Sequence, residues 1–148
     1  MSTTKLAILG CGNIGSAIAK GLAKSGMAPG NITLTRRKSE SLTELNQAGY
    51  QTTSDNVSAV QNSEIILLTV GPGQLMDLLG ETSQSLSENH LLISIVSGVS
   101  ISEIQAKVGK EIPIIRAMPN TAAALCESMT CLSSLSQFTQ GLKTAQSL

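Results

Sequence analysis

Residues 5–22 read KLAILGCGNIGSAIAKGL, and this stretch decides the fold. It opens on a short apolar run, residues 5–9, which a glycine closes, as is typical of a buried strand. Beyond Asn13 the apolar and small residues recur with the spacing of one helix face, at Ile14, Ala17, Ile18, Gly21 and Leu22. The change of period predicts a strand, a tight turn and a helix in direct succession.

The rest of the chain repeats this alternation of apolar strands with single helices. Further strands are predicted at residues 32–35, 50–53, 64–70, 91–96, 112–116 and 129–132. Helices are predicted from a capping box at 41–44, over 56–61, after Pro72, from a capping box at 100–103, and, largely polar, at the C-terminal end. Such an order predicts a parallel sheet with both faces covered. The expected fold class is α/β, a Rossmann-type, doubly wound, mainly parallel sheet in three layers, with residues 1–148 as a single dinucleotide-binding domain.

The glycine turn is the first candidate for a binding site. Gly10-Cys11-Gly12-Asn13-Ile14-Gly15 has the spacing GxGxxG and lies directly between the predicted strand and helix. The first glycine suits a tight turn, the second close approach of a pyrophosphate, and the third close packing of helix on strand. The pyrophosphate would then lie at the positive end of the helix. The alternative, a glycine-rich turn without a ligand, is disfavoured by this position.

The end of the second strand indicates which dinucleotide is bound. An NAD site usually has Asp or Glu there, about 20 residues past the glycines, to bond the ribose hydroxyls. This chain has Thr35, Arg36, Arg37 and Lys38 instead. Guanidinium groups pair with a 2′-phosphate and a threonine can donate its hydroxyl, whereas a carboxylate would repel the phosphate. The expected cofactor is NADP(H), and the alternative is a solvated basic loop.

Three further strand ends are expected to line the same crevice, because ligands of open parallel sheets bind outside the carboxyl ends of the strands. Any one of these segments alone is more typical of an ordinary turn, but together they favour a wall for the nicotinamide half of the cofactor. They comprise Thr69, Val70, Gly71 and Pro72, then Ser97 and Gly98, then residues 117–121.

Composition narrows the function classes. Hydrophobic residues make up 41% of the 148 residues and charged residues 14%, which is a globular composition. Only 1% of the residues are aromatic, and ten basic residues balance ten acidic ones, so neither nucleic acid nor a membrane surface is an expected partner. We expect a cytoplasmic protein with reduced thiols at Cys11, Cys126 and Cys131.

Catalytic side chains are not apparent. His90, the single histidine, precedes the fifth predicted strand, so it is expected at the end of the sheet opposite the crevice. The sequence contains no Ser/His/Asp set, paired carboxylates or metal-ligand spacing, and we therefore assign neither catalytic nor metal-binding residues.

Four segments together are similar to the pyrroline-5-carboxylate reductase family. They are Gly-Cys-Gly-Asn-Ile-Gly at 10–15, Ser-Asp-Asn at 54–56, Ser-Ile-Val-Ser-Gly-Val-Ser-Ile at 94–101 and Arg-Ala-Met-Pro-Asn-Thr at 116–121. The resemblance runs over about residues 4 to 135 in the family's order. It implies an NADPH-dependent reductase that passes a hydride to a small cyclic imine to make proline. It further implies that Asn56 lies near the adenosine side of the cofactor, and that Met118, Pro119 and Asn120 face the substrate.

The chain departs from the family pattern at Gly71, Ala122 and Ser128, where Lys, Pro and Gly are usual. It also lacks a match to the family's helical C-terminal half, which builds the dimer and grips the substrate. We therefore expect the N-terminal domain of a longer protein or a natural fragment, which binds NADPH, turns over imine poorly, and forms homo-oligomers only at full length.

Two other functions remain open at this point. The first is a related NADPH-dependent reductase of another imine, a deazaflavin or a 3-hydroxy acid. The second is a non-catalytic NADP-sensing module.

Overall fold

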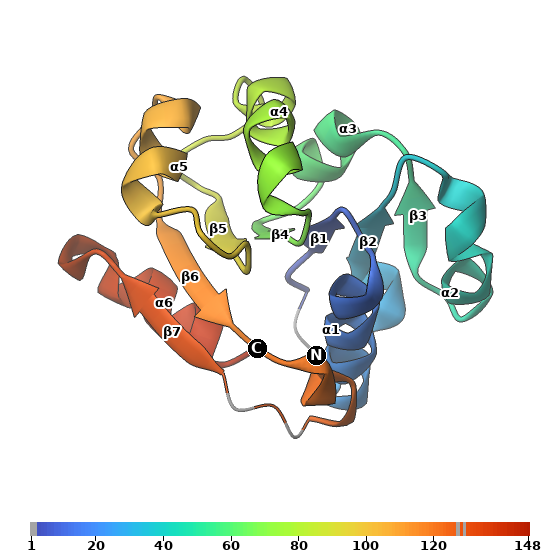
Figure 1. The fold of residues 1–148 in the computed structure, drawn as a ribbon. Coiled ribbons are helices and arrows are strands. Elements are labelled where there is room, and N and C mark those ends of the chain that lie inside the picture. Colours follow the sequence, from blue (N-terminus) through green and yellow to red (C-terminus); the bar gives the residue numbers. More distant parts are fainter. Residues whose placement is uncertain (1–2, 127, 129) are drawn as a thin grey trace.

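The protein is built on one twisted sheet with the strand order β3-β2-β1-β4-β5-β6-β7 (Figure 1). The computed structural model describes residues 3–126, 128 and 130–148. The strands are β1 (Leu6–Leu9), β2 (Ile32–Thr35), β3 (Gln51–Thr53), β4 (Ile65–Leu68), β5 (Leu91–Ser94), β6 (Ile114–Met118) and β7 (Cys131–Ser134). Neighbouring strands are parallel except β7, which pairs antiparallel with β6.

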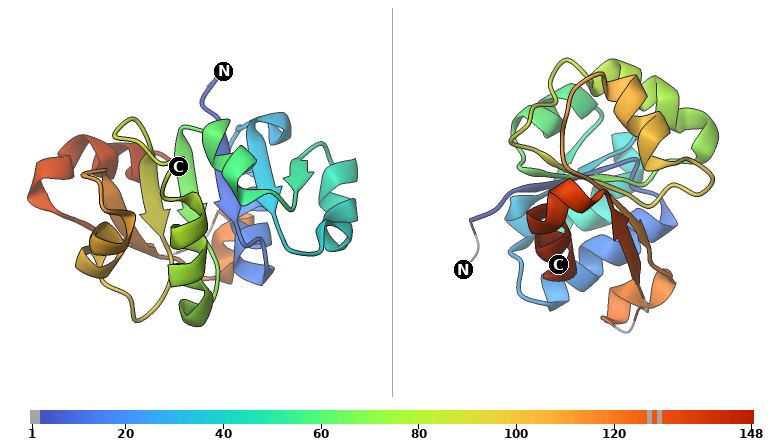
Figure 2. Two further views of the ribbon diagram at one scale, coloured as in Figure 1. Left: turned by 90° about the horizontal axis from the view of Figure 1, so that it is seen from above. Right: turned by 90° about the vertical axis from the view of Figure 1, so that its left-hand side faces the viewer.

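Helices cover both faces of the sheet, so the molecule has three layers (Figure 2). The α-helices are α1 (Asn13–Lys24), α2 (Thr43–Gln47), α3 (Asn56–Gln61), α4 (Pro72–Thr82), α5 (Ile101–Val108) and α6 (Thr139–Gln146). Short 3-10 helices lie at η1 (Pro29–Asn31), η2 (Ser39–Leu42), η3 (Thr121–Leu125) and η4 (Ser136–Phe138). The predicted fold class, a doubly wound and mainly parallel Rossmann-type sheet, is confirmed.

Two apolar cores follow from the alternation of side chains along the strands. Ala7, Leu9, Ile66 and Leu68 point to one face, where α3, α4 and α5 pack on them. Leu6, Ile8, Ile65 and Leu67 point to the other face and contact α1 and α6. The strands are therefore buried on both faces, which explains why they read as unbroken apolar runs in the sequence.

Several predicted boundaries need correction. The sixth strand begins two residues later than predicted and extends to Met118, because residues 115–118 pair with β7. The last strand is predicted at residues 129–132 and lies at Cys131–Ser134; Met129 is outside the described residues. The capping box at 41–44 is wrong, since the Ser41 hydroxyl donates to the carbonyl of Lys38 and residues 39–42 form a 3-10 helix.

The order of the strands places the candidate site. β1 lies between β2 and β4, and the helices that follow β1 and β4 pack on opposite faces of the sheet. The connections diverge there, and this switch point opens a crevice beyond the carboxyl ends of the two strands. Over the part of the chain that the structure describes, no helix is long and apolar enough to cross a membrane.

Candidate cofactor site

The turn after β1 is closed by its own hydrogen bonds. Gly10 has a φ of +84°, a left-handed conformation that a residue with a Cβ adopts only with strain. Its N–H donates to the Thr35 hydroxyl over 3.2 Å, and the N–H of Cys11 donates to the Thr35 carbonyl over 2.7 Å. The N–H of Gly12 turns back to the carbonyl of Gly10 over 2.8 Å. These three donors shape the turn and are not free for a ligand.

The first turn of α1 supplies the free donors instead. Asn13, Ile14 and Gly15 are its first three residues, and their N–H groups have no carbonyl partner within the helix. Ser16 is the first residue to make a helical bond, donating to the carbonyl of Gly12. Three N–H groups at the positive end of a twelve-residue helix form a site suited to a phosphate group.

Close packing explains the third glycine. A Cβ at Gly15 would lie 3.0 Å from the Thr69 hydroxyl oxygen and 3.2 Å from a methyl carbon of Ile8. The Thr69 hydroxyl lies 2.9 Å from the carbonyl oxygen of Leu9 and 3.1 Å from that of Gly10, and it donates into this pair. The start of α1 is thereby held against the ends of both β1 and β4.

A cleft of about 580 Å³ opens beside this turn. One wall carries three exposed cationic side chains, those of Arg36, Arg37 and Lys38. The opposite wall is the polar face of α4, which carries the carboxylates of Asp77 and Glu81. Of the predicted cofactor residues, the cleft is lined by Gly10, Gly12, Thr35, Arg36, Arg37, Asn56, Thr69, Val70 and Gly71.

Residues of α4 and of the segment after β2 also line this cleft, although the sequence patterns did not predict them there. They are Lys38, Ser41, Gln74, Asp77, Leu78 and Glu81. Lys38 was visible as the third residue of a basic run. The spacing of Gln74, Asp77 and Glu81, three and four residues apart, marks one helix face, but only the fold shows that this face looks into the cleft.

Asn56 connects the two walls. Its Oδ1 accepts a 2.6 Å hydrogen bond from the Thr35 hydroxyl, and its Nδ2 lies 3.2 and 3.4 Å from the two carboxylate oxygens of Glu81. Thr35 is 1% exposed and already donates its hydroxyl proton to Asn56. The geometry makes Thr35 a support of the glycine turn rather than a donor toward the cleft.

Other predicted residues lie apart from the cleft lining. Ser97 and Gly98 are exposed beyond β5 and Met118 is 44% exposed at the end of β6. Asn120 caps η3, its Oδ1 accepting from the N–H of Ala122. Pro119 lines a different cavity, described below.

The Cys11 side chain is fully buried on the core side of the turn. Burial raises the pKa of its thiol above the usual 9.0; the hydrogen bond with Ser16 and the positive charge of Arg36 act in the opposite direction but are smaller effects. The thiol is therefore held in its neutral form.

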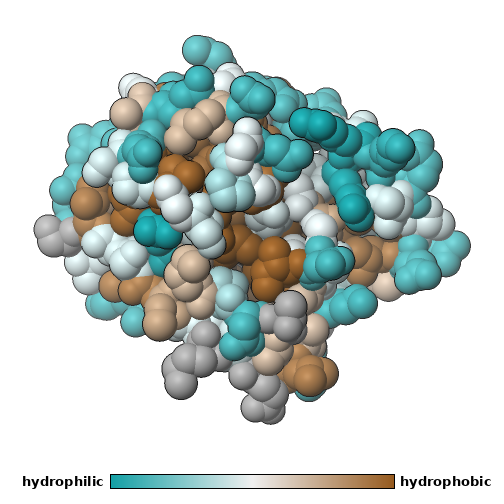
Figure 3. All heavy atoms as spheres, in the orientation of Figure 1, coloured by the Kyte–Doolittle hydropathy of each residue, from teal (hydrophilic) through white to brown (hydrophobic). Residues whose placement is uncertain are grey.

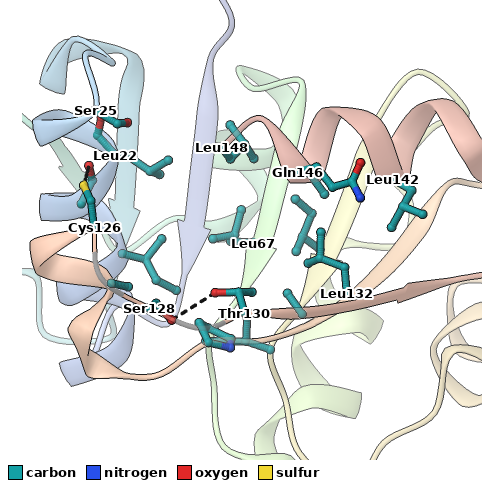
Figure 4. A pocket seen from close by; sticks show the side chains of 18 residues that line it. Leu22, Ser25, Leu67, Cys126, Ser128, Thr130, Leu132, Leu142, Gln146 and Leu148 are labelled. Atoms are coloured by element: carbon teal, nitrogen blue, oxygen red, sulfur yellow. Dashed lines mark hydrogen bonds between the residues drawn. The ribbon is translucent and has the colours of Figure 1, made fainter.

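A second cavity, of about 550 Å³, lies between α1 and α6, on the face of the sheet that these two helices cover (Figure 4). Leu22 of α1, Leu67 of β4 and Leu142 of α6 give it an apolar lining. The last helix, predicted to be largely polar, thus has an apolar edge, and its Leu142 and Ala145 pack on the core. In Figure 3 hydrophilic side chains dominate the end of the molecule that carries α2 and β3, whereas apolar ones gather near the middle.

His90 directly precedes β5 and lies at the amino end of that strand, opposite the crevice, as predicted. Its Nδ1 accepts from the N–H of Ser87 over 2.9 Å, which uses it in a local turn. Among the described residues, no cluster of three or more His, Cys, Asp or Glu side chains could hold a metal ion.

Fold and cleft together define a dinucleotide-binding α/β protein. A family model described as NADP oxidoreductase coenzyme F420-dependent matches residues 5–98, and the chain belongs to this family. It is 49% identical over 128 residues to pyrroline-5-carboxylate reductase 1 of Dictyostelium discoideum, and this alignment covers 86% of this chain and 23% of that relative. The family resemblance seen in the sequence motifs is thereby confirmed.

Solved structures agree. A pyrroline-5-carboxylate reductase from Coxiella burnetii superposes with a TM-score of 0.90 at 31% identity, over 98% of this chain and 54% of that one. Pyrroline carboxylate reductase of Plasmodium falciparum, crystallised with NADP bound, gives a TM-score of 0.83 at 26% identity, over 96% and 53% of the two chains. The chain spans about half the length of both structures.

Proposed function

We propose that this chain binds NADPH and forms the cofactor-binding half of a pyrroline-5-carboxylate reductase. One observation carries the cofactor assignment: the end of β2 places Arg36, Arg37 and Lys38 in the cleft beside the glycine turn, where an NAD site would place a carboxylate. The NADP bound to the Plasmodium falciparum relative supports the same choice.

The cleft and the first turn of α1 beside it together fit each part of this cofactor. The free N–H groups of Asn13, Ile14 and Gly15 would receive the pyrophosphate. The guanidinium groups of Arg36 and Arg37 would pair with the 2′-phosphate. A Cβ at Gly12 would have no atom closer than 4.0 Å, so this glycine leaves open the side from which the pyrophosphate would approach.

The chemistry needs little from the side chains. When bound, NADPH would supply a hydride from C4 of its nicotinamide to the C=N carbon of the protonated imine, whose nitrogen keeps its proton in the product amine. The segment of Thr69, Val70, Gly71 and Pro72 would orient the nicotinamide half, and Met118, Pro119 and Asn120 would face the substrate. We propose that the contribution of this chain is positioning and that none of its side chains serves as a general acid or base.

A second function is supported by the family description, which names coenzyme F420. A related NADPH-dependent reductase would use the same cleft with another acceptor. The curated relative and the two structures above, all named pyrroline-5-carboxylate or pyrroline carboxylate reductases, favour the cyclic imine.

The test is a calorimetric titration of the chain with NADPH and with NADH. The pair Arg36→Glu, Arg37→Glu is expected to raise the Kd for NADPH by at least about 100-fold, since each lost charge-assisted hydrogen bond contributes about 1.5–3 kcal/mol, and to leave NADH binding nearly unchanged. The matched control is Lys20→Glu, Lys143→Glu, which makes the same change of charge outside the cleft. Equal affinity of the wild type for NADH and NADPH would refute the assignment of the cofactor.

A further inference from the structure

Glu81 closes a chain of hydrogen bonds that runs from α4 across the cleft to the glycine turn. The Gly10 N–H donates to the Thr35 hydroxyl over 3.2 Å, and this hydroxyl donates to Asn56 Oδ1 over 2.6 Å. Asn56 Nδ2 then donates to the Glu81 carboxylate, with oxygens at 3.2 and 3.4 Å. The four groups come from four separate segments: the turn after β1, the end of β2, the first residue of α3, and the last turn of α4.

The carboxylate fixes the direction of the whole chain. An ionised carboxylate can only accept, so Asn56 must turn its NH₂ group toward Glu81 and its Oδ1 toward Thr35. The single hydroxyl proton of Thr35 is then committed to Asn56, which leaves a lone pair of Thr35 for the N–H of Gly10. Without Glu81 the Asn56 amide could rotate by 180°, and the Thr35 hydroxyl would lose its fixed orientation. The hydrogen bond from the Gly10 N–H to this hydroxyl, which holds the start of the glycine turn, would then be weakened.

The place of Glu81 in its helix argues against a role in stability alone. α4 ends at Thr82, so Glu81 lies in the last turn, where the negative end of the helix dipole disfavours a carboxylate. The last turn holds no basic residue to offset this charge. A carboxylate here is also a neighbour of the proposed 2′-phosphate site, since Glu81 lines the same cleft as Arg36 and Arg37. Local electrostatics therefore disfavour this residue on two counts.

We infer that Glu81 is a positioning residue of the cofactor cleft, which acts through Asn56 and Thr35 on the glycine turn. The inference rests on the proposed binding of NADPH. The parts that Glu81 orders, Asn56 and the turn, would face the adenosine and pyrophosphate, which NADPH and NADH have in common. Loss of Glu81 should therefore weaken both cofactors, NADPH somewhat less than NADH because a negative charge beside the 2′-phosphate is removed as well. Loss of Arg36 and Arg37, in contrast, should weaken NADPH alone.

The experiment titrates the 148-residue chain with NADPH and NADH in the wild type, Glu81→Ala, Glu81→Gln and Asp77→Ala. Asp77 is the matched control, because it is a carboxylate on the same face of α4 and lines the cleft but takes no part in the chain of hydrogen bonds. Glu81→Ala is expected to raise both Kd values about five- to tenfold, less than the full effect of a hydrogen bond to a charged group, because the loss reaches the cofactor only through Asn56 and Thr35. Its melting temperature should be unchanged or higher. Glu81→Gln keeps an acceptor oxygen and should lie between Glu81→Ala and the wild type.

Each outcome decides one question. If Glu81→Ala and Asp77→Ala both tighten NADPH, Glu81 acts only through its charge and the inference is wrong. Wild-type affinity in Glu81→Ala, or an equal loss in Asp77→Ala, also overturns it. A lowered melting temperature together with unchanged affinity would show a structural role alone. Failure of the wild type to bind NADPH would instead refute the proposed function, so the two failures are distinguishable.

Discussion

Gly10→Ala is expected to destabilise the fold by about 2–5 kcal/mol, from two separable causes. The first is conformational: Gly10 has a φ of +84°, and an L-residue in the left-handed region costs about 1–2 kcal/mol. The second is steric: a Cβ there would lie 2.2 Å from a methyl carbon of Val70 and 3.3 Å from the Val70 Cα. Relief of such an overlap by local shifts typically costs about 1–3 kcal/mol. The sum is a large share of the roughly 5–15 kcal/mol that stabilises a domain.

A double-mutant cycle with Val70→Ala separates the two causes. Val70→Ala removes the methyl group that the new Cβ would meet, so only the conformational cost should remain in the double variant. Urea unfolding, followed by circular dichroism, gives the four free energies of unfolding. We expect a coupling energy of about 1–3 kcal/mol between the two substitutions.

The matched control is Gly12→Ala. The nearest atom to a Cβ at Gly12 is 4.0 Å away and its φ is −96°, so its free energy of unfolding should change by less than about 1 kcal/mol. Since Gly12 lines the cleft, NADPH binding should nevertheless fall. A neutral Gly10→Ala would refute the assignment of a left-handed turn, and a coupling energy near zero would refute the steric part of the reasoning.

Three further predictions follow from single residues. Gly71→Lys should be tolerated, because a Cβ there meets only Gln74 Oε1 at 3.8 Å, and the added cation on the cleft wall should lower the Kd for NADPH a few-fold in calorimetry. The Cys11 thiol should react with iodoacetamide at neutral pH far more slowly than the exposed Cys126, because burial raises the pKa of Cys11 and blocks access of the reagent. The rates are measured by mass spectrometry of the labelled peptides, and equal rates would contradict this prediction. Hydrogen bonds from the Ser100 backbone and hydroxyl lower the pKa of Glu103 below its usual 4.5 in the folded state. The contribution of this carboxylate to stability is therefore present above pH 4.5 and is lost as the pH falls through the lowered pKa of the folded state. In urea unfolding, Glu103→Gln should lose less stability than the wild type between about pH 6 and about pH 3.

Local patterns in the sequence predicted the elements whose causes are local. Residues 65–68 read as a buried strand because both faces of β4 are covered, and nothing distant alters that pattern. Ser100 and Glu103 form the predicted capping box because the two partners lie three residues apart in one helix turn. The similar pattern at Ser41 failed, since its hydroxyl finds the Lys38 carbonyl first and a 3-10 turn replaces the start of a helix.

The cleft was predictable to the extent that strand ends define it. Arg36 and Arg37 follow β2 directly, so their arrival beside the glycine turn required only the parallel sheet. Glu81 could not be predicted, because its contact with Asn56 joins residues 25 apart and depends on how α4 packs beside α3. Ser97 lay in a similar strand end but does not line the cleft, since β5 is one strand further from the switch point than β4.

The Thr69 hydroxyl, which bonds to the carbonyls of Leu9 and Gly10, also bears on how the chain folds. It links residues 60 and 59 positions apart, because β1 pairs with β4, a strand that is not its neighbour in the sequence. Contacts of such long range close slowly, because the loop entropy is lost before any pairing is gained. The glycine turn therefore cannot reach its final shape in an early intermediate that contains only local contacts. In refolding, the ability to bind the cofactor should appear with the global fold, in a single kinetic phase, rather than with the first helices.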